Sequence, residues 1–361
     1  MDRILSVNWN VSPDIFSLDV PWWVFLLALA VTVGFGIKLY RSRPRPESIP
    51  ANASRKERAR LAEELKERKS EYEWGMIVCV LLGVVFLMAT RCVRADGGSW
   101  TLQLRWYSIL FVAGFILGWF IFKWFFTREG IRLSLMDNLL YTLLACTIIG
   151  ARLGHCLFYQ PDYYLGSWQG FLEIFMPWKG GLASHGGTIA LILGMWIFAR
   201  VYGKDNDFDF VWLLDHLAIA VAFAGCFIRL GNLFNSEIYG GPTDLPWGFV
   251  FQRNGDTVPC HPTQLYEASL YFLLGVFLIL LYKYRLDKTW RGTYVGIFLI
   301  VCFGGRFLIE FIKNPQVEFE KTMLLNMGQL LSIPFVLLGI GFLVYAYRKK
   351  IPARAVHADA A

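Results

Sequence analysis

The side chains with the most distinctive chemistry lie in the run AGCFIRLGNLFNSEIYGGPT, residues 224–243. A long apolar stretch is followed there by Arg229, Asn232, Asn235 and Glu237. Polar and charged groups at membrane depth are costly, which makes them functional candidates by default. A guanidinium offers a planar fork of donors that fits an anion such as a phosphate. The run therefore predicts a polar, anion-binding site at one end of a membrane helix.

Four further segments place titratable side chains beside glycine or aromatic residues. Residues 180–187, GGLASHGG, contain His185, and an imidazole is a natural general base near neutral pH. The two glycines after His185 allow close approach of the backbone to a lipid. The other segments are GARLG at 150–154, with Arg152; HPTQLYE at 261–267, with His261, Tyr266 and Glu267; and RFLIE at 306–310, with Arg306 and Glu310, followed by Lys313.

Each of these residues also has a purely structural interpretation. Arg229 and Arg306 could extend from helix ends toward the interface. Glu267 and Glu310 could form structural ion pairs, and His185 could be an ordinary turn residue. Three further residues outside these segments carry the same ambiguity: Tyr107 could be an interfacial anchor, and Asp215–His216 could be a proton relay or satisfied packing within a helix.

The elements that must position these side chains are membrane helices. Hydrophobic residues make up 56% of the 361 and charged residues 17%, with mean hydropathy +0.44; a soluble domain carries about 25% charged residues. Apolar runs long enough to approach a bilayer span predict an all-α, polytopic membrane protein with about nine helices. The runs are 20–37, 75–90, 106–122, 133–160, 186–199, 208–228, 268–282, 293–312 and 324–347.

The distribution of Lys and Arg predicts the orientation. With the N-terminus outside, the predicted cytoplasmic segments hold 24 of the 35 basic residues, as the positive-inside rule requires. These segments are 38–74, 123–132, 200–204, 283–291 and 348–361. The formal net charge of +7 then reflects topology and contact with anionic lipid rather than nucleic acid. This orientation predicts that the polar residues of 180–187 and 229–240 face the outer side.

Neither a signal peptide nor a metal or disulfide framework is indicated. The first apolar run is full length and lacks a small-residue cleavage pattern, so we expect a retained helix. The seven cysteines are scattered, mostly within apolar runs and without a CxxC pair, which is typical of small buried side chains.

The run Arg229-x-Gly-Asn-x-x-Asn-x-Glu-x-x-Gly240 resembles the signature of the prolipoprotein diacylglyceryl transferases. The segments at 150–154, 180–187, 261–267 and 306–313 resemble further motifs of that family in the same order. The aromatic motif Arg105-Trp-Tyr-Ser108 and the opening segment 13–18 are similar to family elements as well. The family runs almost directly from one to the other, so 20–104 is predicted to be an inserted transmembrane hairpin.

The resemblance implies the domain organisation. Residues 1–19 form an outer N-terminal segment, 20–104 the inserted hairpin with a charged cytoplasmic stretch at 41–74, 105–347 the transferase-like core of about seven helices, and 348–361 a cytoplasmic tail. The resemblance places the chain in the bacterial cytoplasmic (inner) membrane, with its site toward the outer leaflet.

The resemblance also implies the reaction. A diacylglyceryl group passes from phosphatidylglycerol to the lipobox cysteine thiol of a prolipoprotein signal peptide, a thioether forms and glycerol phosphate departs, without cofactor, metal or nucleic acid. The implied catalytic residues are His185, Arg229, Glu237 and Arg306. The implied lipid-binding residues are Tyr107, Arg152, Arg229, Asn232, Asn235, Gly240 and Arg306, and the supporting ones are His261, Tyr266, Glu267 and Glu310. Whether His185 or another group takes the thiol proton stays open.

Two other classes of function fit the composition. A transporter or channel for an anionic solute would line its pathway with intramembrane Arg and Glu, although such folds often show repeated halves and none is detected here. A non-catalytic membrane scaffold would need neither His185 nor the arginine pair.

Overall fold

The computed structural model describes residues 6–21, 54–55, 57–58, 61, 93–94, 99–175, 183–314 and 323–355. The chain divides into two compact units, residues 14–109 and residues 1–13 with 110–361. The predicted spans at 20–37 and 75–90 and most of the charged stretch 41–74 lie outside the described residues, apart from the strand positions 20 and 21.

The smaller unit contains a three-stranded antiparallel sheet that the sequence did not predict. Its strands are β2 (Asp14–Pro21), β3 (Val93–Arg94) and β4 (Ser99–Arg105), in the order β2-β4-β3. Asp14 pairs with Arg105, and the Arg105 Nε lies 3.3 Å from the Asp14 carboxylate. Residues on either side of the predicted insertion are therefore direct neighbours.

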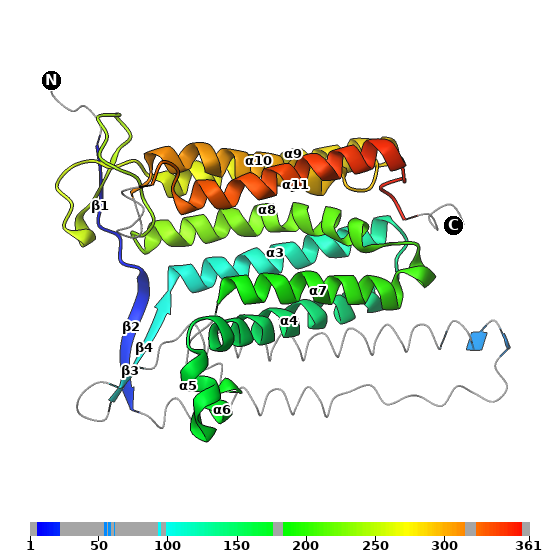
Figure 1. The fold of residues 1–361 in the computed structure, drawn as a ribbon, viewed down its shortest axis with the longest axis horizontal. Helices are drawn as coiled ribbons and strands as arrows, with labels where there is room; N and C mark the ends of the chain where they lie inside the picture. Colours follow the sequence, from blue (N-terminus) through cyan, green and yellow to red (C-terminus); the bar gives the residue numbers. More distant parts are fainter. Residues whose placement is uncertain are drawn as a thin grey trace. The chain divides into compact units, whose positions relative to one another are not determined.

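The larger unit is a bundle of helices, and it confirms the all-α, polytopic fold class (Figure 1). Six of the described helices are long and apolar enough to cross a membrane, and Gly186–Tyr202 is a shorter apolar helix. These seven helices match seven of the nine predicted runs. They are α3 (Trp106–Arg128), α4 (Ser134–Phe158), α7 (Ser184–Tyr202), α8 (Phe210–Phe234), α9 (Thr263–Arg285), α10 (Thr293–Ile309) and α11 (Met327–Lys349).

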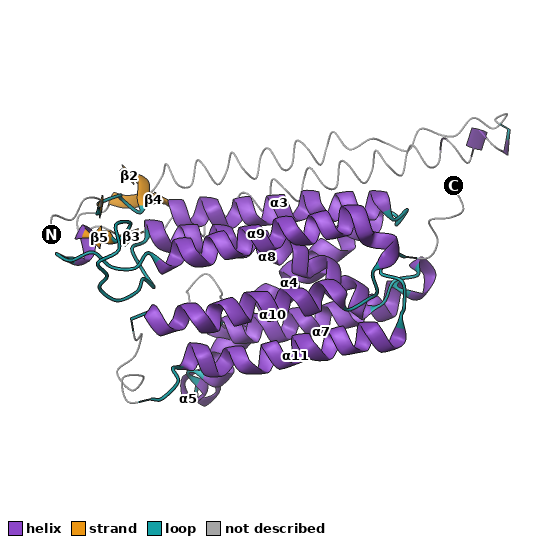
Figure 2. Ribbon diagram, turned by 90° about the horizontal axis from the view of Figure 1, so that it is seen from above, coloured by secondary structure: helices purple, strands orange, loops and turns teal. Residues whose placement is uncertain are grey.

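Shorter elements connect these helices. Helices α5 (Pro161–Gly166) and α6 (Trp168–Ile174) follow α4, and strand β5 (Phe249–Phe251) lies in the long connection after α8, where it pairs in parallel with β1 (Val7–Trp9). The 3-10 turns are η2 (Lys204–Asn206), η3 (Gln252–Asn254), η4 (Leu286–Lys288) and η5 (Glu310–Ile312). Figure 2 shows that the described residues are mostly helix, with a few short strands.

The helices alternate in direction, so the connections gather at two opposite ends (Figure 1). Helix α4 packs chiefly on α7, α8 on α9, and α10 on α11, while α10 also contacts α8 and α9. One end carries the turns 129–133, 203–209 and 286–292 and the C-terminal segment. The other end carries the long connections after α4, α8 and α10, and with them the sequence motifs.

Burial separates a packed interior from an apolar outer surface. Phe125, Trp212, Leu278 and Tyr282 are fully buried where α3, α8 and α9 meet. Large apolar side chains on the outward faces of the helices are exposed, among them Phe120 and Ile149. Such a surface suits contact with lipid, because there is no hydrophobic cost to exposing it in a bilayer.

Candidate functional site

The end of α8 carries the first group of predicted site residues. Arg229 is nearly buried, and its Nη1 lies 3.5 Å from the Asn232 Oδ1. The Asn232 amide donates to Glu237 Oε1 over 2.7 Å, and the Asn235 amide donates to the same oxygen over 3.1 Å. The structure therefore brings the four polar residues of this motif into one connected group.

The loop after α8 is held in an unusual backbone conformation. Ser236 and Ile238 have φ values of 56° and 59°, and the left-handed region is a real outlier for a β-branched residue such as Ile238. Two donors at the start of α9 hold the loop: Gln264 Nε2 binds the Glu237 carbonyl over 2.8 Å, and Thr263 Oγ1 binds the Ile238 carbonyl over 3.0 Å. Backbone strain of this kind clusters at functional sites.

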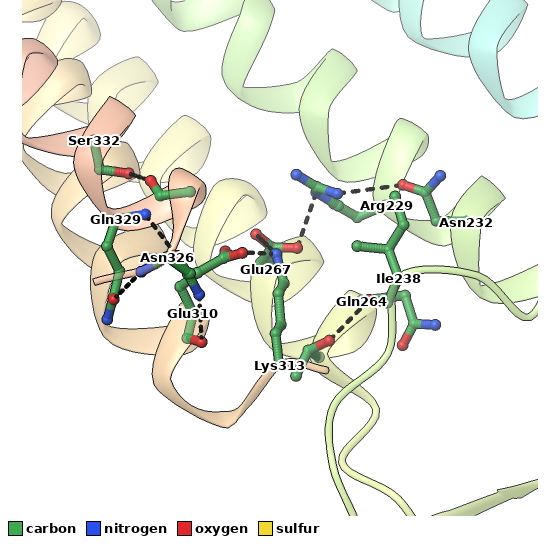
Figure 3. A network of polar contacts seen from close by, with 12 residues as sticks. Arg229, Asn232, Ile238, Gln264, Glu267, Glu310, Lys313, Asn326, Gln329 and Ser332 are labelled. Atoms are coloured by element: carbon green, nitrogen blue, oxygen red, sulfur yellow. Dashed lines mark hydrogen bonds and ion pairs between the residues drawn. The ribbon is translucent and has the colours of Figure 1, made fainter. Parts of the chain in front are cut away.

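Glu267 of α9 is the centre of a buried ion-pair chain (Figure 3). Its carboxylate, which is fully buried, lies 3.0 Å from Arg229 Nε on one side and 3.0 Å from Lys313 Nζ on the other. Lys313 also lies 3.1 Å from Glu310. Charges alternate along this chain, which is how buried charges are tolerated. The structural ion pairing considered for Glu267 and Glu310 is therefore present.

Hydrogen bonds connect this series of ion pairs to the start of α11. Asn326 Nδ2 donates to the Glu310 carbonyl over 3.2 Å, and Asn326 and Gln329 form a reciprocal capping box. Gly328 packs against the Glu310 carboxyl group so closely that a Cβ there would lie 2.5 Å from its Cδ. Residues of α8 and α9, of the turn η5 directly after α10, and of the start of α11 thus meet at one end of the bundle.

Arg306 lies near the end of α10 and differs from Arg229 in its surroundings. It is half-buried, and among the described residues no carboxylate lies within ion-pair distance of it. The phenol of Tyr271, on α9, is close enough to interact electrostatically with both Arg229 and Arg306. Both arginines thus lie within electrostatic range of one phenol, and Arg306 has no carboxylate partner within the described part of the chain.

Gly240 and the HPTQLYE segment shape the rim of this group. Gly240 N donates to the His261 carbonyl over 2.9 Å, and a Cβ on Gly240 would lie 2.5 Å from the Ile312 carbonyl oxygen. The hydroxyl of Tyr266 receives the Trp247 indole N–H over 2.9 Å and lies 3.4 Å from His261 Nδ1. Burial raises the pKa of the nearby Cys260 thiol, so this cysteine stays protonated.

The glycines of the 150–154 and 180–187 motifs pack two helices together. A Cβ on Gly150 would lie 2.6 Å from the Gly186 carbonyl oxygen, and one on Gly154 would lie 2.7 Å from the Gly186 Cα. Small residues spaced four apart allow such backbone contact between membrane helices. The sequence predicted that the backbone at Gly186 approaches a lipid. In the structure the backbone at Gly186 packs against α4 instead.

Three predicted residues are not placed in the Arg229–Lys313 group. Arg152 is buried and donates to the carbonyls of Glu173 and Ile174 at the end of α6. His185 belongs to α7 by its backbone, but its side chain lies outside the described residues. Tyr107 belongs to the smaller unit.

Sequence reasoning missed several residues of the network. Thr263, Gln264 and Lys313 were quoted within motifs but given no role, and their hydrogen bonds could not be read from spacing alone. Asp215 and His216 do not form a relay with each other, since Asp215 bonds to α10 and His216 bonds to Trp212 and Glu129. The cysteines of the described residues are free, and four of these five are buried.

Comparison with known proteins gives one consistent result. The sequence model of the family described as prolipoprotein diacylglyceryl transferase matches residues 99–345. A Tolumonas auensis protein named phosphatidylglycerol–prolipoprotein diacylglyceryl transferase is 44% identical over 249 residues, which cover 69% of this chain and 93% of that protein. Proteins of the same name from Bacteroides fragilis and Porphyromonas gingivalis are 42% and 44% identical, covering 69% and 68% of this chain and 91% and 90% of the relatives.

Proposed function

The chain belongs to the prolipoprotein diacylglyceryl transferase family, and from this premise we propose how its residues carry out the reaction. It is a transferase that moves a diacylglyceryl group from phosphatidylglycerol to prolipoproteins. Family membership does not support the anionic-solute transporter considered from the composition. A bare scaffold would not need the polar network at the end of α8.

We propose that the acceptor atom is the sulfur of the lipobox cysteine. The thiolate attacks the diacylglyceryl carbon bound to the phosphate oxygen, a C–S bond forms, and the C–O bond breaks. Glycerol phosphate leaves with the bonding electron pair. The thiol must lose its proton because the thiolate is the nucleophile, and His185 is our candidate base for that proton.

The arrangement of the two arginines carries this proposal. Negative charge grows on the leaving phosphate, so fixed positive charge there lowers the barrier. Glu267 contacts Arg229 through Nε, which leaves the terminal nitrogens of the guanidinium directed elsewhere, one of them 3.5 Å from Asn232. Arg306 has no carboxylate partner among the described residues, so its charge is available to an anion.

The remaining residues have supporting roles in this proposal. Glu237 accepts hydrogen bonds from the amides of Asn232 and Asn235, and in this proposal it holds the two side chains in place to bind the glycerol of the lipid headgroup. Lys313 and Glu310 hold Glu267 in place. Gly240 and His261 fix the rim by a backbone hydrogen bond. Arg152 orients the α5–α6 segment through the α6 carbonyls, and Tyr107 remains a proposed lipid contact.

We propose the inner membrane as the location, with the site at the outer leaflet, the N-terminus outside and the C-terminus in the cytoplasm. The basic side chains support this orientation, because Arg128, Arg200, Lys283 and Arg348 lie in the last turns of helices that end opposite the site. We also propose that residues 20–104 are an insertion in the family core, which the pairing of β2 with β4 supports.

The test measures transfer of radiolabelled diacylglyceryl from phosphatidylglycerol to a lipobox peptide. Arg229→Lys and Arg306→Lys should each lower the rate by about a hundredfold, because the point charge survives while the bidentate geometry is lost. The double variant should lose much less than the product of the two losses, as residues acting on one group do. Arg253→Lys is the matched control, since Arg253 is exposed in the connection at the same end. Full activity in either test variant would remove that arginine from the site.

A further inference from the structure

Glu129, directly after α3, is a buried carboxylate far from the proposed site. It is fully inaccessible to solvent and accepts hydrogen bonds from four groups. Oε1 accepts from the Tyr282 hydroxyl over 2.7 Å and lies 2.7 Å from His216 Nε2. Oε2 accepts from the Trp212 indole over 2.9 Å and from the backbone N–H of Ala355 over 2.8 Å. A carboxylate so buried is tolerated because its acceptor sites are filled.

His216, on α8, links Glu129 to the backbone of that helix. Its Nδ1 lies 2.7 Å from the Trp212 carbonyl oxygen, which can only accept, so Nδ1 carries a hydrogen. His216 and Glu129 therefore hold one further proton between Nε2 and Oε1. Burial by itself raises the pKa of Glu129, but His216 and the hydrogen-bond donors outweigh burial, and the pKa is lowered overall.

The neighbouring residue, Asp215, binds the start of another helix, α10. Its carboxylate accepts from the backbone N–H groups of Gly292, over 2.6 Å, and Val295, over 2.8 Å. These N–H groups lie at the N-terminus of α10, and the N–H groups of a first turn have no partner within the helix. An acidic side chain from α8 therefore caps α10, and it is 1% exposed.

These bonds involve α8, α9 and α10, the three helices that carry Arg229, Glu267 and Arg306. Along α8, Arg229 follows His216 by 13 residues; along α9, Tyr282 follows Glu267 by 15. At a rise of 1.5 Å per residue these separations are about 20 Å and about 22 Å. Along α10, Arg306 lies about 17 Å from Val295. Each of these helices thus reaches from the site to the opposite end of the bundle. Glu129, Asp215 and their hydrogen-bond partners lie there, and we call them the Glu129–Asp215 cluster.

We propose that Glu129 and Asp215 are positioning residues for the transfer reaction. They fix how far α8, α9 and α10 slide along one another, and thereby the spacing of Arg229, Glu267 and Arg306 at the opposite end. The inference rests on the roles proposed above for those three residues. Helices are stiff along their axes, so a shift at one end reaches the other, and a misplacement of 1 Å can cost about a hundredfold in rate.

The test compares three variants of the cluster with a control from the same end of the bundle. Glu129→Gln turns an amide NH₂ toward the donors of Trp212 and Ala355 or toward those of His216 and Tyr282. Asp215→Asn likewise sets a donor against an N–H of α10. Tyr282→Phe removes only one of the four hydrogen bonds and keeps the ring, so it remains informative where the others fail to fold.

Thr289→Val is the matched control. Its hydroxyl binds the Leu286 carbonyl over 2.9 Å and lies 3.0 Å from the Tyr294 hydroxyl, and it contacts neither carboxylate of the cluster. All variants are assayed for phosphatidylglycerol-dependent transfer well below their unfolding temperatures. We expect kcat of the cluster variants to fall about tenfold to a hundredfold, with KM for the lipid little changed. The control should keep wild-type kcat despite its lower thermal stability.

Two results would overturn the inference. The first is that the cluster variants unfold at a lower temperature but, while folded, have the wild-type kcat. The second is that the kcat of Thr289→Val falls as far as the kcat of the cluster variants when the loss of stability is the same. Arg229→Lys in the same assay separates this inference from the site assignment. An inactive Arg229→Lys beside fully active cluster variants refutes the inference alone, whereas an active Arg229→Lys refutes the proposed site.

Discussion

Replacing Glu267 by Gln removes the negative charge at the centre of the buried ion-pair chain. The substitution keeps the shape of the side chain, so the result reports mainly on charge. Lys313 retains Glu310 at 3.1 Å, whereas Arg229 is left with the amide oxygen of Asn232 at 3.5 Å and the phenol of Tyr271. The arginine, whose side chain is 12% exposed, becomes the uncompensated cation. Breaking a buried pair from one side costs about 3–5 kcal/mol, and we expect a loss of this size.

The assay is a double-mutant cycle read by unfolding in detergent. Glu267→Gln, Lys313→Met and the double variant are compared with wild type, and Asp205→Asn, at an exposed turn on the opposite side of the bundle, is the control. The double variant should be more stable than the sum of the single losses predicts, by about 1–3 kcal/mol, because either single substitution already breaks the Glu267–Lys313 pair and its loss is counted twice in the sum. Transfer should fall in Glu267→Gln because Arg229 loses its orientation.

A small effect would refute this reasoning. If Glu267→Gln unfolds within about 0.5 kcal/mol of wild type, as an exposed substitution would, then the chain of buried charges contributes little to the fold. If it also transfers at the wild-type rate, Glu267 does not orient Arg229 for the reaction. Simple additivity in the cycle would show that Glu267 and Lys313 act independently.

Three further predictions follow from the structure and its topology. Gly186→Ala should destabilise the protein and lower transfer, since a Cβ would lie 2.6 Å from the Gly154 Cα; thermal unfolding tests this, with Gly166→Ala, at a position with open space, as the control. A membrane-impermeant thiol reagent added from outside should label Thr243→Cys and spare Ala51→Cys, and the reverse labelling would contradict the proposed orientation. The pKa of Glu129 is lowered from its ordinary 4.5, so its stabilising effect is present at neutral pH and is lost on acidification through the lowered pKa. The gap in unfolding temperature between wild type and Glu129→Gln should therefore narrow in acid.

The sequence predicted the helices well because lipid imposes a simple rule on them. An apolar run of sufficient length has to be helical in a bilayer, since every backbone group must be satisfied within the segment. The seven runs in the described residues therefore became helices near their predicted bounds. The strands β2 and β4 were not predicted, because their pairing joins residues about 85 positions apart and short strands carry little pattern.

The site was predicted in its residue types but not in its connections. Arg229, Asn232 and Glu237 lie within one turn and loop, so their spacing already indicated a common group. Lys313 reaches Glu267 across 46 residues of sequence, and no local pattern encodes that distance. Glu129 was less predictable still, since it follows Arg128 in a charged turn and resembles a solvated residue. One of its hydrogen-bond donors, the N–H of Ala355, lies 226 residues away in the sequence.

The placement of charge explains why the chemistry is expected at one end only. Buried carboxylates lie at both ends of the bundle, Glu129 and Asp215 at one end and Glu267 and Glu310 at the other. At the Glu129–Asp215 end the described donors and acceptors match, and the groups that face Glu129 fill its acceptor sites. At the Glu267 end the chain of alternating charges stops short of Arg306, which has no carboxylate partner among the described residues. A cation left half-buried at the edge of a membrane is costly without an anion, so the phosphate of the substrate is the partner that would complete this network.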